Sequence, residues 1–199
     1  ALALSATNIA ENSPANSVVG SFTTSDPDAG DTFTYSLVDP AGTTDNAAFT
    51  ISGNQLRLIG IPNFEANPSY SVLVRTTDKA GLFFDQVFTI TVQDVGETPT
   101  AINLSATNID ENQPINSVVG TLSTLDPDLP NDSFTYSLVA GTGPNDNASF
   151  RIVGNQLQIT TVPNFEVKPS YSVTIRSTDK DGLFVDATFI VRVLSLIHI

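Results

Sequence analysis

The sequence predicts an all-β protein built from two tandem copies of one β-sandwich domain. Three observations support this prediction: a repeat with a period of about 100 residues, strand-like segments rich in Thr, Val, Ile, Tyr and Phe, and no helical periodicity of useful length. Each copy contains about seven such segments. We therefore expect two tandem seven-stranded Greek-key β-sandwiches of an immunoglobulin-like type.

Short motifs recur along the whole chain. LSATNI begins at Leu4 and Leu104, and FTYSLV begins at Phe33 and Phe134. The offset is 100 residues for the first motif and 101 for the second, which indicates one inserted residue. This period is too long for a solenoid, whose repeats contain roughly 20–50 residues. We assign residues 1–99 to a first repeat ending in an acidic connector, 93–99, and residues 100–193 to a second repeat.

Alternation within the segments predicts which side chains form the cores. Tyr70, Val72 and Val74 share one face of a strand, because successive side chains of a strand point to opposite faces. Between residues 88 and 92, Phe, Ile and Val alternate with two threonines in the same way. The segment Ser-Gly-Asn-Gln at 52–55 predicts a tight hairpin, since Gly accepts the positive φ of such turns.

The charge balance restricts the classes of partner. The chain carries 21 acidic and 8 basic residues, a net charge of −13. Nucleic-acid binding is disfavoured, because it depends on Lys and Arg displacing counterions from phosphates. A cationic partner is favoured, and a metal ion is the simplest one. There is no Cys, which excludes disulfides and Cys-ligated zinc, and no apolar run long enough to span a membrane.

The acidic residues gather at repeat landmarks rather than along strand faces. Glu11 ends the first predicted strand, Glu65 closes the motif PNFE, and Glu97 lies in the connector. Aspartates of the motifs DPD and TDK also lie at predicted strand ends, and in the second repeat these are Asp126, Asp128 and Asp179.

Taken in order, these motifs resemble the cadherin repeat. They are Glu-Asn after the first strand, Asp-x-Asp after the second, Phe-Glu before a Tyr-containing strand, Thr-Asp-x-x-Gly, and the connector Asp-x-x-Glu-x-Pro. Each motif is weak alone, but five in the family's order, four of them present in both repeats, are specific. The resemblance covers essentially the whole chain and is greatest to the cadherin-like tandem repeats of large bacterial surface proteins.

The resemblance implies a calcium-binding joint between the repeats, with up to three Ca²⁺ ions. The first repeat and the connector would supply Glu11, Glu65, Asp94, Glu97 and the carbonyl oxygen of Gly96. The second repeat would supply Asp126, Asp128, Asp179 and a carbonyl oxygen of Asn131. Calcium suits such a set because it accepts roughly 6–8 oxygen ligands in irregular geometry. Seven carboxylates carry −7 against +6 for three ions, and their mutual repulsion predicts a flexible metal-free joint.

Three features limit this prediction. Asn63 and Asn164 stand where the family has Asp in Asp-x-Glu, so one site should be weaker or empty. Asp26, Asp28 and Asp78 would complete a joint with a preceding repeat, and residues 194–199 lack the acidic connector and are expected not to be native to the domain. Five further aspartates are expected to be ordinary surface acids: Asp31, Asp39, Asp45, Asp85 and Asp132.

The predicted function is a calcium-rigidified module of a secreted or cell-surface protein that serves adhesion, anchored through parts outside this segment. Its partners would be calcium and, through homophilic or other contacts, a cell-surface protein or glycan. Two alternatives stay open: a non-adhesive structural spacer, and a carbohydrate- or protein-binding accessory module of a large secreted enzyme. Catalysis in this segment is not expected, since Trp and Cys are absent and the single His, His198, lies in the terminal residues.

Overall fold

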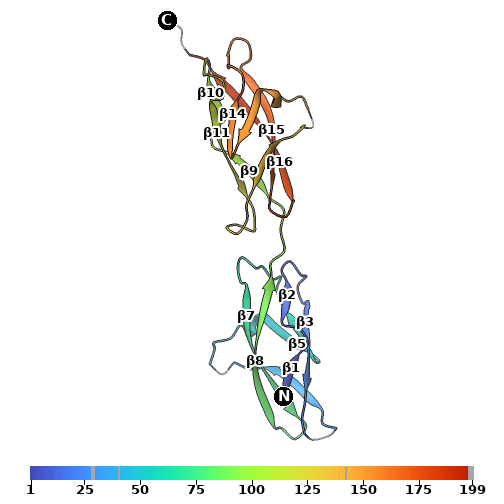
Figure 1. Ribbon diagram of the computed structural model, residues 1–199. Helices are drawn as coiled ribbons and strands as arrows, with labels where there is room; N and C mark the ends of the chain where they lie inside the picture. The colour runs from blue at the N-terminus through green and yellow to red at the C-terminus, as the bar shows by residue number, and fades with distance from the viewer. Residues whose placement is uncertain (28–29, 40, 142, 197–199) are drawn as a thin grey trace. The chain divides into compact units, whose positions relative to one another are not determined.

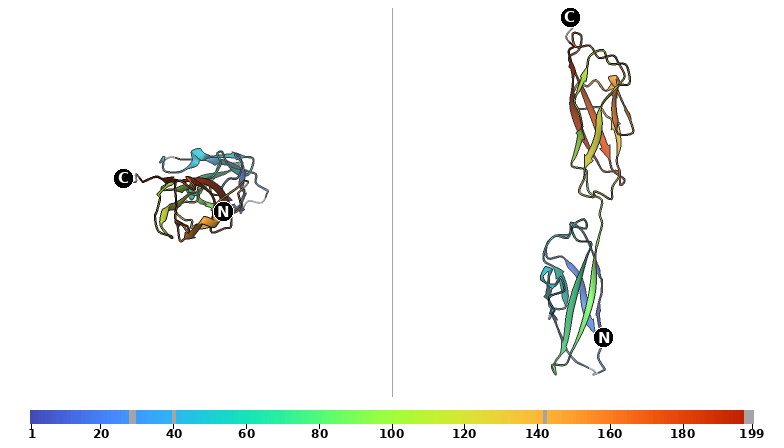
Figure 2. Two further views of the ribbon diagram at one scale, coloured as in Figure 1. Left: turned by 90° about the horizontal axis from the view of Figure 1, so that it is seen from above. Right: turned by 90° about the vertical axis from the view of Figure 1, so that its left-hand side faces the viewer.

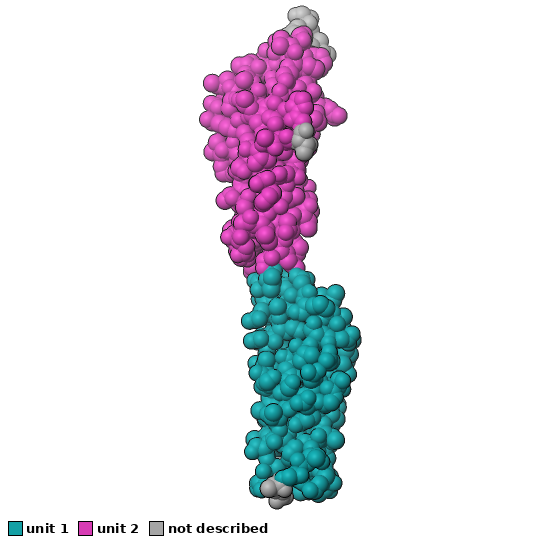
Figure 3. Space-filling view, turned by 90° about the vertical axis from the view of Figure 1, so that its right-hand side faces the viewer, with its two compact units in different colours: residues 1–95 teal, residues 96–199 magenta. Residues whose placement is uncertain are grey.

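The chain forms two compact units, residues 1–95 and 96–199 (Figure 3). The structure is a computed structural model that describes residues 1–27, 30–39, 41–141 and 143–196. Each unit contains eight strand segments and one short 3₁₀ helix among these residues, which confirms the all-β prediction (Figure 1).

The first unit contains two four-stranded sheets, ordered β1-β3-β6-β5 and β2-β8-β7-β4. The strands of the first sheet are β1 (Leu2–Leu4), β3 (Val18–Thr24), β5 (Phe49–Ser52) and β6 (Gln55–Leu58). Those of the second sheet are β2 (Asn8–Ala10), β4 (Phe33–Leu37), β7 (Ser69–Asp78) and β8 (Phe83–Gln93). The long β7–β8 pair runs along the length of this unit (Figure 2).

The second unit repeats this topology, with sheets ordered β9-β11-β14-β13 and β10-β16-β15-β12. The strands of the first sheet are β9 (Ala101–Leu104), β11 (Val118–Leu125), β13 (Phe150–Val153) and β14 (Gln156–Ile159). Those of the second sheet are β10 (Asn108–Asp110), β12 (Thr135–Leu138), β15 (Ser170–Thr178) and β16 (Phe184–Leu194).

The number of strand segments exceeds the expected seven because the first strand of each unit is divided. β1 pairs antiparallel with β3 in one sheet, and after a three-residue break β2 pairs parallel with β8 in the other. β9 and β10 repeat this division. One predicted strand therefore serves both sheets, as is usual where a strand switches sheets in a sandwich.

The divided strand requires a close approach that only glycine permits. Opposite the break, β11 has a bulge between Val118 and Gly120. A Cβ atom on Gly120 would lie 2.9 Å from both the amide nitrogen and the carbonyl oxygen of Ala106. Gly20 faces Ala6 in the same way in the first unit. The glycine of the repeated NSVVG motif is therefore a packing requirement of the fold.

Each unit has its own hydrophobic core between its two sheets. In the first unit Val72, Val74, Ile90 and Val92 are buried, which confirms the alternation predicted for these strands. The equivalent positions of the second unit are also buried, and Phe150 and Tyr171 pack edge to face there. Burying such side chains is the main source of stability for a chain without disulfides.

A tight hairpin turn connects β5 to β6, and each unit has one short 3₁₀ helix among the described residues. Gly53 has a φ of +62° between β5 and β6, where Ser52 pairs with Gln55, so the predicted hairpin is confirmed. The 3₁₀ helices are η1 (Asn46–Ala48) and η2 (Asn147–Ser149). None of the helices in the described part of the chain is long and apolar enough to cross a membrane.

Candidate metal centre

Acidic loops meet at one end of the second unit. Asp126 and Asp128 directly follow β11, Asp179 directly follows β15, and Asp132 lies in the loop that leads to β12. Asp126, Asp132 and Asp179 each offer a carboxylate oxygen, and these oxygens lie within 4.8 Å of one another. The two strand ends and the loop between them therefore bring together residues more than 50 positions apart in the sequence.

Backbone amides orient these carboxylates. The N–H of Asp128 donates to Oδ1 of Asp126 at 2.9 Å, and the N–H groups of Asp181 and Leu183 each donate to Oδ1 of Asp179 at 2.8 Å. The N–H of Ser133 donates to Oδ1 of Asp132 at 2.6 Å. One oxygen of each carboxylate is thus held by its own loop, as is common for aspartates in turns.

The second oxygen of each carboxylate is buried and has no hydrogen-bond partner in the described structure. This is true of Oδ2 of Asp126, Asp132 and Asp179 and of Oδ1 of Asp128. Burial raises the pKa of Asp126, and the neighbouring charges of Asp128, Asp132 and Asp179 raise it further, against the hydrogen bond from the Asp128 amide. Buried carboxylate oxygens without a donor are costly unless a cation binds them.

The start of the second unit contributes a further carboxylate. The N–H of Glu97 donates to Oδ2 of Asp128 at 2.8 Å, and a carboxylate oxygen of Glu97 lies within 4.8 Å of one of Asp128. Gly96 packs against Asp181, because a Cβ atom there would lie 2.6 Å from Oδ2 of that residue. A side chain at position 96 would therefore collide with the loop after β15.

The first unit has an acidic pair at the end where its last strand leaves. Glu11 is almost fully buried and accepts two backbone hydrogen bonds: from Val95 at 2.7 Å and from Phe64 at 2.9 Å. A carboxylate oxygen of Glu65 lies within 4.8 Å of one of Glu11. Glu11 therefore ties the end of the unit to the PNFE motif.

The asparagine of the Glu-Asn motif fixes the backbone conformation next to Glu11 and so orients the Glu11 side chain. Asn12 has a φ of +58° and its N–H donates to the carbonyl oxygen of Pro62 at 2.9 Å. Asn tolerates this left-handed conformation better than most residues. In the second unit Asn112 has a φ of +63°, and Glu111 accepts a 2.6 Å hydrogen bond from the N–H of Leu196. Residues 195 and 196 thus occupy the place that residues 94 and 95 have after β8.

The asparagines that replace the family's aspartate have local roles. Oδ1 of Asn63 accepts a hydrogen bond from the N–H of Ala66 at 2.6 Å, and Asn164 binds the N–H of Val167 at 2.9 Å. Both residues are exposed. Their carbonyl oxygens stabilise the turn that follows β6 or β14.

Two predicted ligands are less confined than the others. Asp94 is exposed after β8. Asn131 is also exposed, and its N–H donates to the carbonyl oxygen of Asp128 at 3.0 Å, which closes the loop after β11. The roles of both residues as ligands stay predictions.

The expectation that Asp132 and Asp31 are ordinary surface acids is wrong. The side chain of Asp132 is 0% exposed and belongs to the cluster with Asp126 and Asp179. The equivalent Asp31 is 7% exposed and pairs with Lys79. The missed signal was the recurrence of Asp at the same distance before FTYSLV in both repeats, five residues after the first Asp of DPD in one and six in the other.

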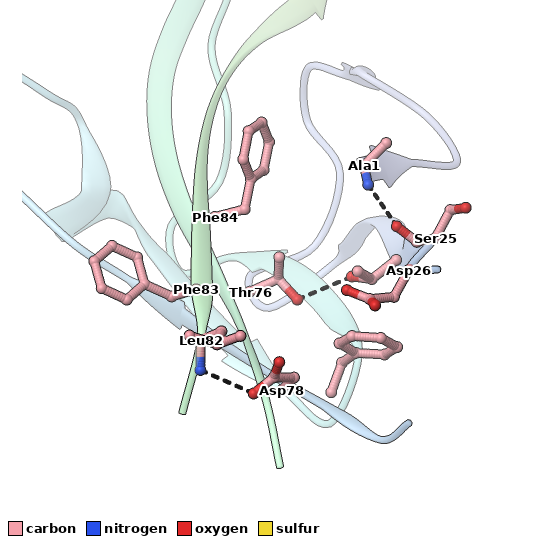
Figure 4. A pocket seen from close by; sticks show the side chains of 10 residues that line it. Ala1, Ser25, Asp26, Thr76, Asp78, Leu82, Phe83 and Phe84 are labelled. Carbon is pink, nitrogen blue, oxygen red and sulfur yellow. Dashed lines mark hydrogen bonds between the residues drawn. The ribbon is translucent and has the colours of Figure 1, made fainter. Parts of the chain in front are cut away.

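The first unit has a corresponding acidic end, shown in Figure 4. There Asp26 and Asp78 line a pocket of about 130 Å³ together with the apolar side chains of Leu82, Phe83 and Phe84. Oδ1 of Asp78 accepts hydrogen bonds from the N–H groups of Ala80 and Leu82, as Asp179 does from its own loop. Asp28, which was expected beside them, lies outside the described residues.

The donor set of the second unit has a defined chemical preference. It consists of carboxylate oxygens from three loops and contains neither thiolate nor imidazole among the described residues. Hard cations prefer such oxygens, and calcium tolerates ligands from several loops better than magnesium does. The buried oxygens without donors therefore fit a calcium-sized divalent cation.

The two repeats match different family models. Residues 105–194 match the family model described as Cadherin domain, and residues 2–93 match the model described as Putative Ig domain. Human Protocadherin-16 is 30% identical over 81% of this chain, and human Protocadherin Fat 4 is 29% identical over 87%. The chain spans only 5% and 4% of those two proteins.

Solved structures share the fold of both units. The chain described as PcdhgB3 EC1-4 has a TM-score of 0.73 at 23% identity and covers 98% of this chain, which spans 50% of it. Human Protocadherin-24 EC1-2 has a TM-score of 0.71 at 16% identity, with 98% of this chain and 99% of that one covered. At these identities the likeness establishes the fold alone.

Proposed function

The chain is a pair of cadherin-like tandem repeats, and from this premise we propose that it is a calcium-binding extracellular module that serves adhesion. The observation that carries the proposal is the buried cluster of the second unit. Asp126, Asp128, Asp132 and Asp179 each keep one oxygen buried and without a donor. Three of these residues, Asp126, Asp132 and Asp179, have carboxylate oxygens within 4.8 Å of one another, which a cation best explains because their mutual repulsion otherwise opposes folding.

Within the second unit, each carboxylate has a distinct task. Asp126, Asp132 and Asp179 would bind one ion through the oxygens that their loops leave unpaired. Asp128 and Glu97 would bind a neighbouring ion, because their carboxylates also lie within 4.8 Å of each other. Bound calcium would supply the positive charge that the cluster lacks, while the loop amides keep the ligands in position.

The short connector supports extending this site to the first unit. Glu11 binds the N–H of Val95, and Asp128 binds the N–H of Glu97, with Gly96 alone between these two residues in the chain. Three consecutive residues span only about 7 Å between their outer Cα atoms. We propose that Glu11 and Glu65, with Asp94 and the carbonyl oxygens of Gly96 and Asn131, complete a joint that holds up to three calcium ions.

Asn63 and Asn164 support a low calcium affinity at the proposed joint. Oδ1 of Asn63 is already used by the N–H of Ala66. The first unit therefore offers Glu11 and Glu65 without a third carboxylate from PNFE. We expect an affinity toward the weak end of the range for extracellular modules, on the order of 10⁻⁴–10⁻³ M.

Calorimetry of the full chain tests the calcium site. We expect calcium to bind with an affinity well above that of magnesium, and Asp179→Asn to weaken it about tenfold, since one charged ligand becomes a neutral amide. Asp110→Asn is the matched control. Asp110 is an exposed residue of β10 in the same unit, so this substitution removes the same charge away from the cluster. Equal calcium binding by wild type and Asp179→Asn would reject this site.

Adhesion is tested separately from calcium binding. Beads coated with the full chain should aggregate in calcium and disperse in chelator. Calcium binding without aggregation would favour a non-adhesive spacer. Retention on a polysaccharide column in both conditions would favour an accessory binding module of a larger secreted protein.

A further inference from the structure

In each unit a lysine lies beside a buried aspartate of the loop that precedes FTYSLV. In the second unit the ammonium group of Lys180 is 4.0 Å from Oδ1 of Asp132 and 3.7 Å from Oδ2 of Asp181. In the first unit the ammonium group of Lys79 is 2.8 Å from Oδ1 of Asp31. Both lysines come from the repeated TDK motif, and both aspartates come from the loop before FTYSLV.

Each lysine has one buried carboxylate near its ammonium group, that of Asp31 or Asp132, although the nearer partner of Lys180, Asp181, has a side chain that is 48% exposed. The side chain of Asp132 is 0% exposed, whereas that of Lys180 is 38% exposed. The lysine therefore reaches from solvent toward a buried anion. The N–H of Lys180 also donates to Oδ1 of Asp132 at 3.3 Å, so the backbone of the TDK turn is attached to the same carboxylate.

We propose that Lys180 is a built-in competitor for the divalent cation: its ammonium group partly neutralises the Asp126–Asp132–Asp179 cluster when metal is absent and weakens metal binding when metal is present. This inference rests on the proposed calcium site.

The positive charge of Lys180 has opposite effects on the metal-free and the metal-bound cluster. In the metal-free protein three carboxylates share a small volume, and a positive charge nearby reduces their repulsion. Once a doubly charged ion occupies the cluster, the same ammonium group repels it. A single lysine therefore stabilises the metal-free unit and lowers its affinity for calcium. A purely structural lysine would not change these two quantities in opposite directions.

The arrangement gives the TDK motif a function of its own. Asp179 is the ligand, and its neighbour Lys180 sets how much calcium is needed to fill the site. Because Lys180 remains partly exposed, its ammonium group can move into solvent when calcium arrives, and the competition is moderate. We expect a change of about five- to tenfold in calcium affinity.

The test uses the full chain with Lys180→Met, which keeps the apolar stem of the side chain and removes the charge. Calcium should bind about five- to tenfold more tightly to this variant, and in chelator its second unit should unfold at a lower urea concentration. Lys180→Arg should behave as wild type in both measurements. Lys168→Met is the matched control, because Lys168 pairs with Asp146 at 2.6 Å beside η2, outside the cluster.

A double-mutant cycle with Asp132→Asn makes the test specific to this pair. Once Asp132 is neutral, we expect Lys180→Met to change calcium affinity much less, since the two residues act through one another. Calcium binding to wild type with no change in Lys180→Met would overturn this inference alone. An equal increase in calcium affinity in Lys168→Met would also overturn it, because the affinity would then depend only on the net charge of the protein. If wild type bound no calcium, both the inference and the proposed function would fail.

Discussion

At the scale of single residues, the candidate site depends on which oxygen of each carboxylate is already used. Loop amides occupy one oxygen of Asp126, Asp128 and Asp179, and they leave the other buried without a donor. An aspartate in such a position has its orientation decided before any metal arrives. The order of the loop therefore lowers the cost of assembling ligands.

Asp128→Asn is predicted to reduce the stabilisation that calcium gives to the second unit. The amide oxygen can still accept the hydrogen bond from Glu97, so the loop should keep its form while one negative charge is lost. A tenfold weaker affinity corresponds to about 1.4 kcal/mol less stabilisation at saturating calcium. Thermal unfolding in calcium and in chelator measures this difference. Asp110→Asn should retain the full calcium effect, and the prediction fails if both variants behave alike.

At the scale of elements, paired strands carry the same ion pair in both units. On β15 and β16 the guanidinium of Arg176 makes two hydrogen bonds with Asp186, at 2.7 and 2.9 Å, and lies 3.6 Å from the ring centroid of Phe184. Arg75 contacts Asp85 and Phe83 in the same way on β7 and β8. The repeated group stabilises a cross-strand pair at the end of the sandwich that contains the acidic loops.

This ion pair predicts a pH-dependent contribution to the stability of the second unit. The hydrogen bond and charge of Arg176 hold the pKa of Asp186 below its ordinary value, against desolvation. The contribution should therefore be complete above the unfolded-state pKa of about 4 and disappear as the pH falls through the lower folded-state pKa. Arg176→Met should lose stability at pH 7 but differ little from wild type near pH 2. Urea unfolding in chelator at pH 7 and near pH 2 measures the free energy of unfolding of both proteins. An equal difference between wild type and Arg176→Met at the two pH values would contradict the prediction.

The divided first strand makes a second prediction at the scale of elements. Gly120→Ala should destabilise the second unit by roughly 1–3 kcal/mol, because its Cβ atom would lie 2.9 Å from backbone atoms of Ala106. Gly143→Ala is the control, since a Cβ atom there meets no atom within 4 Å. Urea unfolding measures both. Equal stabilities of the two variants would show that β9 and β10 can shift away from β11.

At the scale of the whole molecule, the chain consists of two units with separate cores and one short covalent connection. Among the residues that the structure describes, neither core contains a side chain of the other unit. Each unit can therefore fold by burying its own apolar side chains. A bound metal would have its largest effect on the connection between the units. Calcium bound by residues on both sides of the connector would restrict motion between the units.

Small-angle scattering is predicted to detect this restriction. Calcium should narrow the distribution of particle dimensions relative to chelator, because ligands from both units would share ions. Glu11→Ala and Asp128→Ala should each reduce the effect of calcium, whereas Asp110→Ala should not. Identical scattering in calcium and chelator for wild type would remove the joint, while calcium binding by the second unit alone could still be measured by calorimetry.

The amino-acid sequence alone was sufficient to identify the repeat, the strand-rich character, the family and the alternating core positions of two strands in the first unit. These properties follow from periodicity and from motifs that are local in the sequence, such as the alternation from Tyr70 to Val74 and the turn at Gly53. It also identified Asp126, Asp128 and Asp179 as acids at strand ends, because each belongs to a motif that occurs twice.

Which acids come together, and which lie apart from the cluster, was seen only in the folded structure. Asp31 and Asp132 recur at the same distance before FTYSLV, but recurrence alone does not show whether the loop is solvated or folded over a strand end, and their burial is seen only in the folded units. The division of the first strand could not be predicted from the sequence either, since it depends on the close approach of Gly120 in β11 to the backbone of Ala106. Burial and proximity between distant segments are properties of packing, and packing is determined by all of the contacts of the folded unit together.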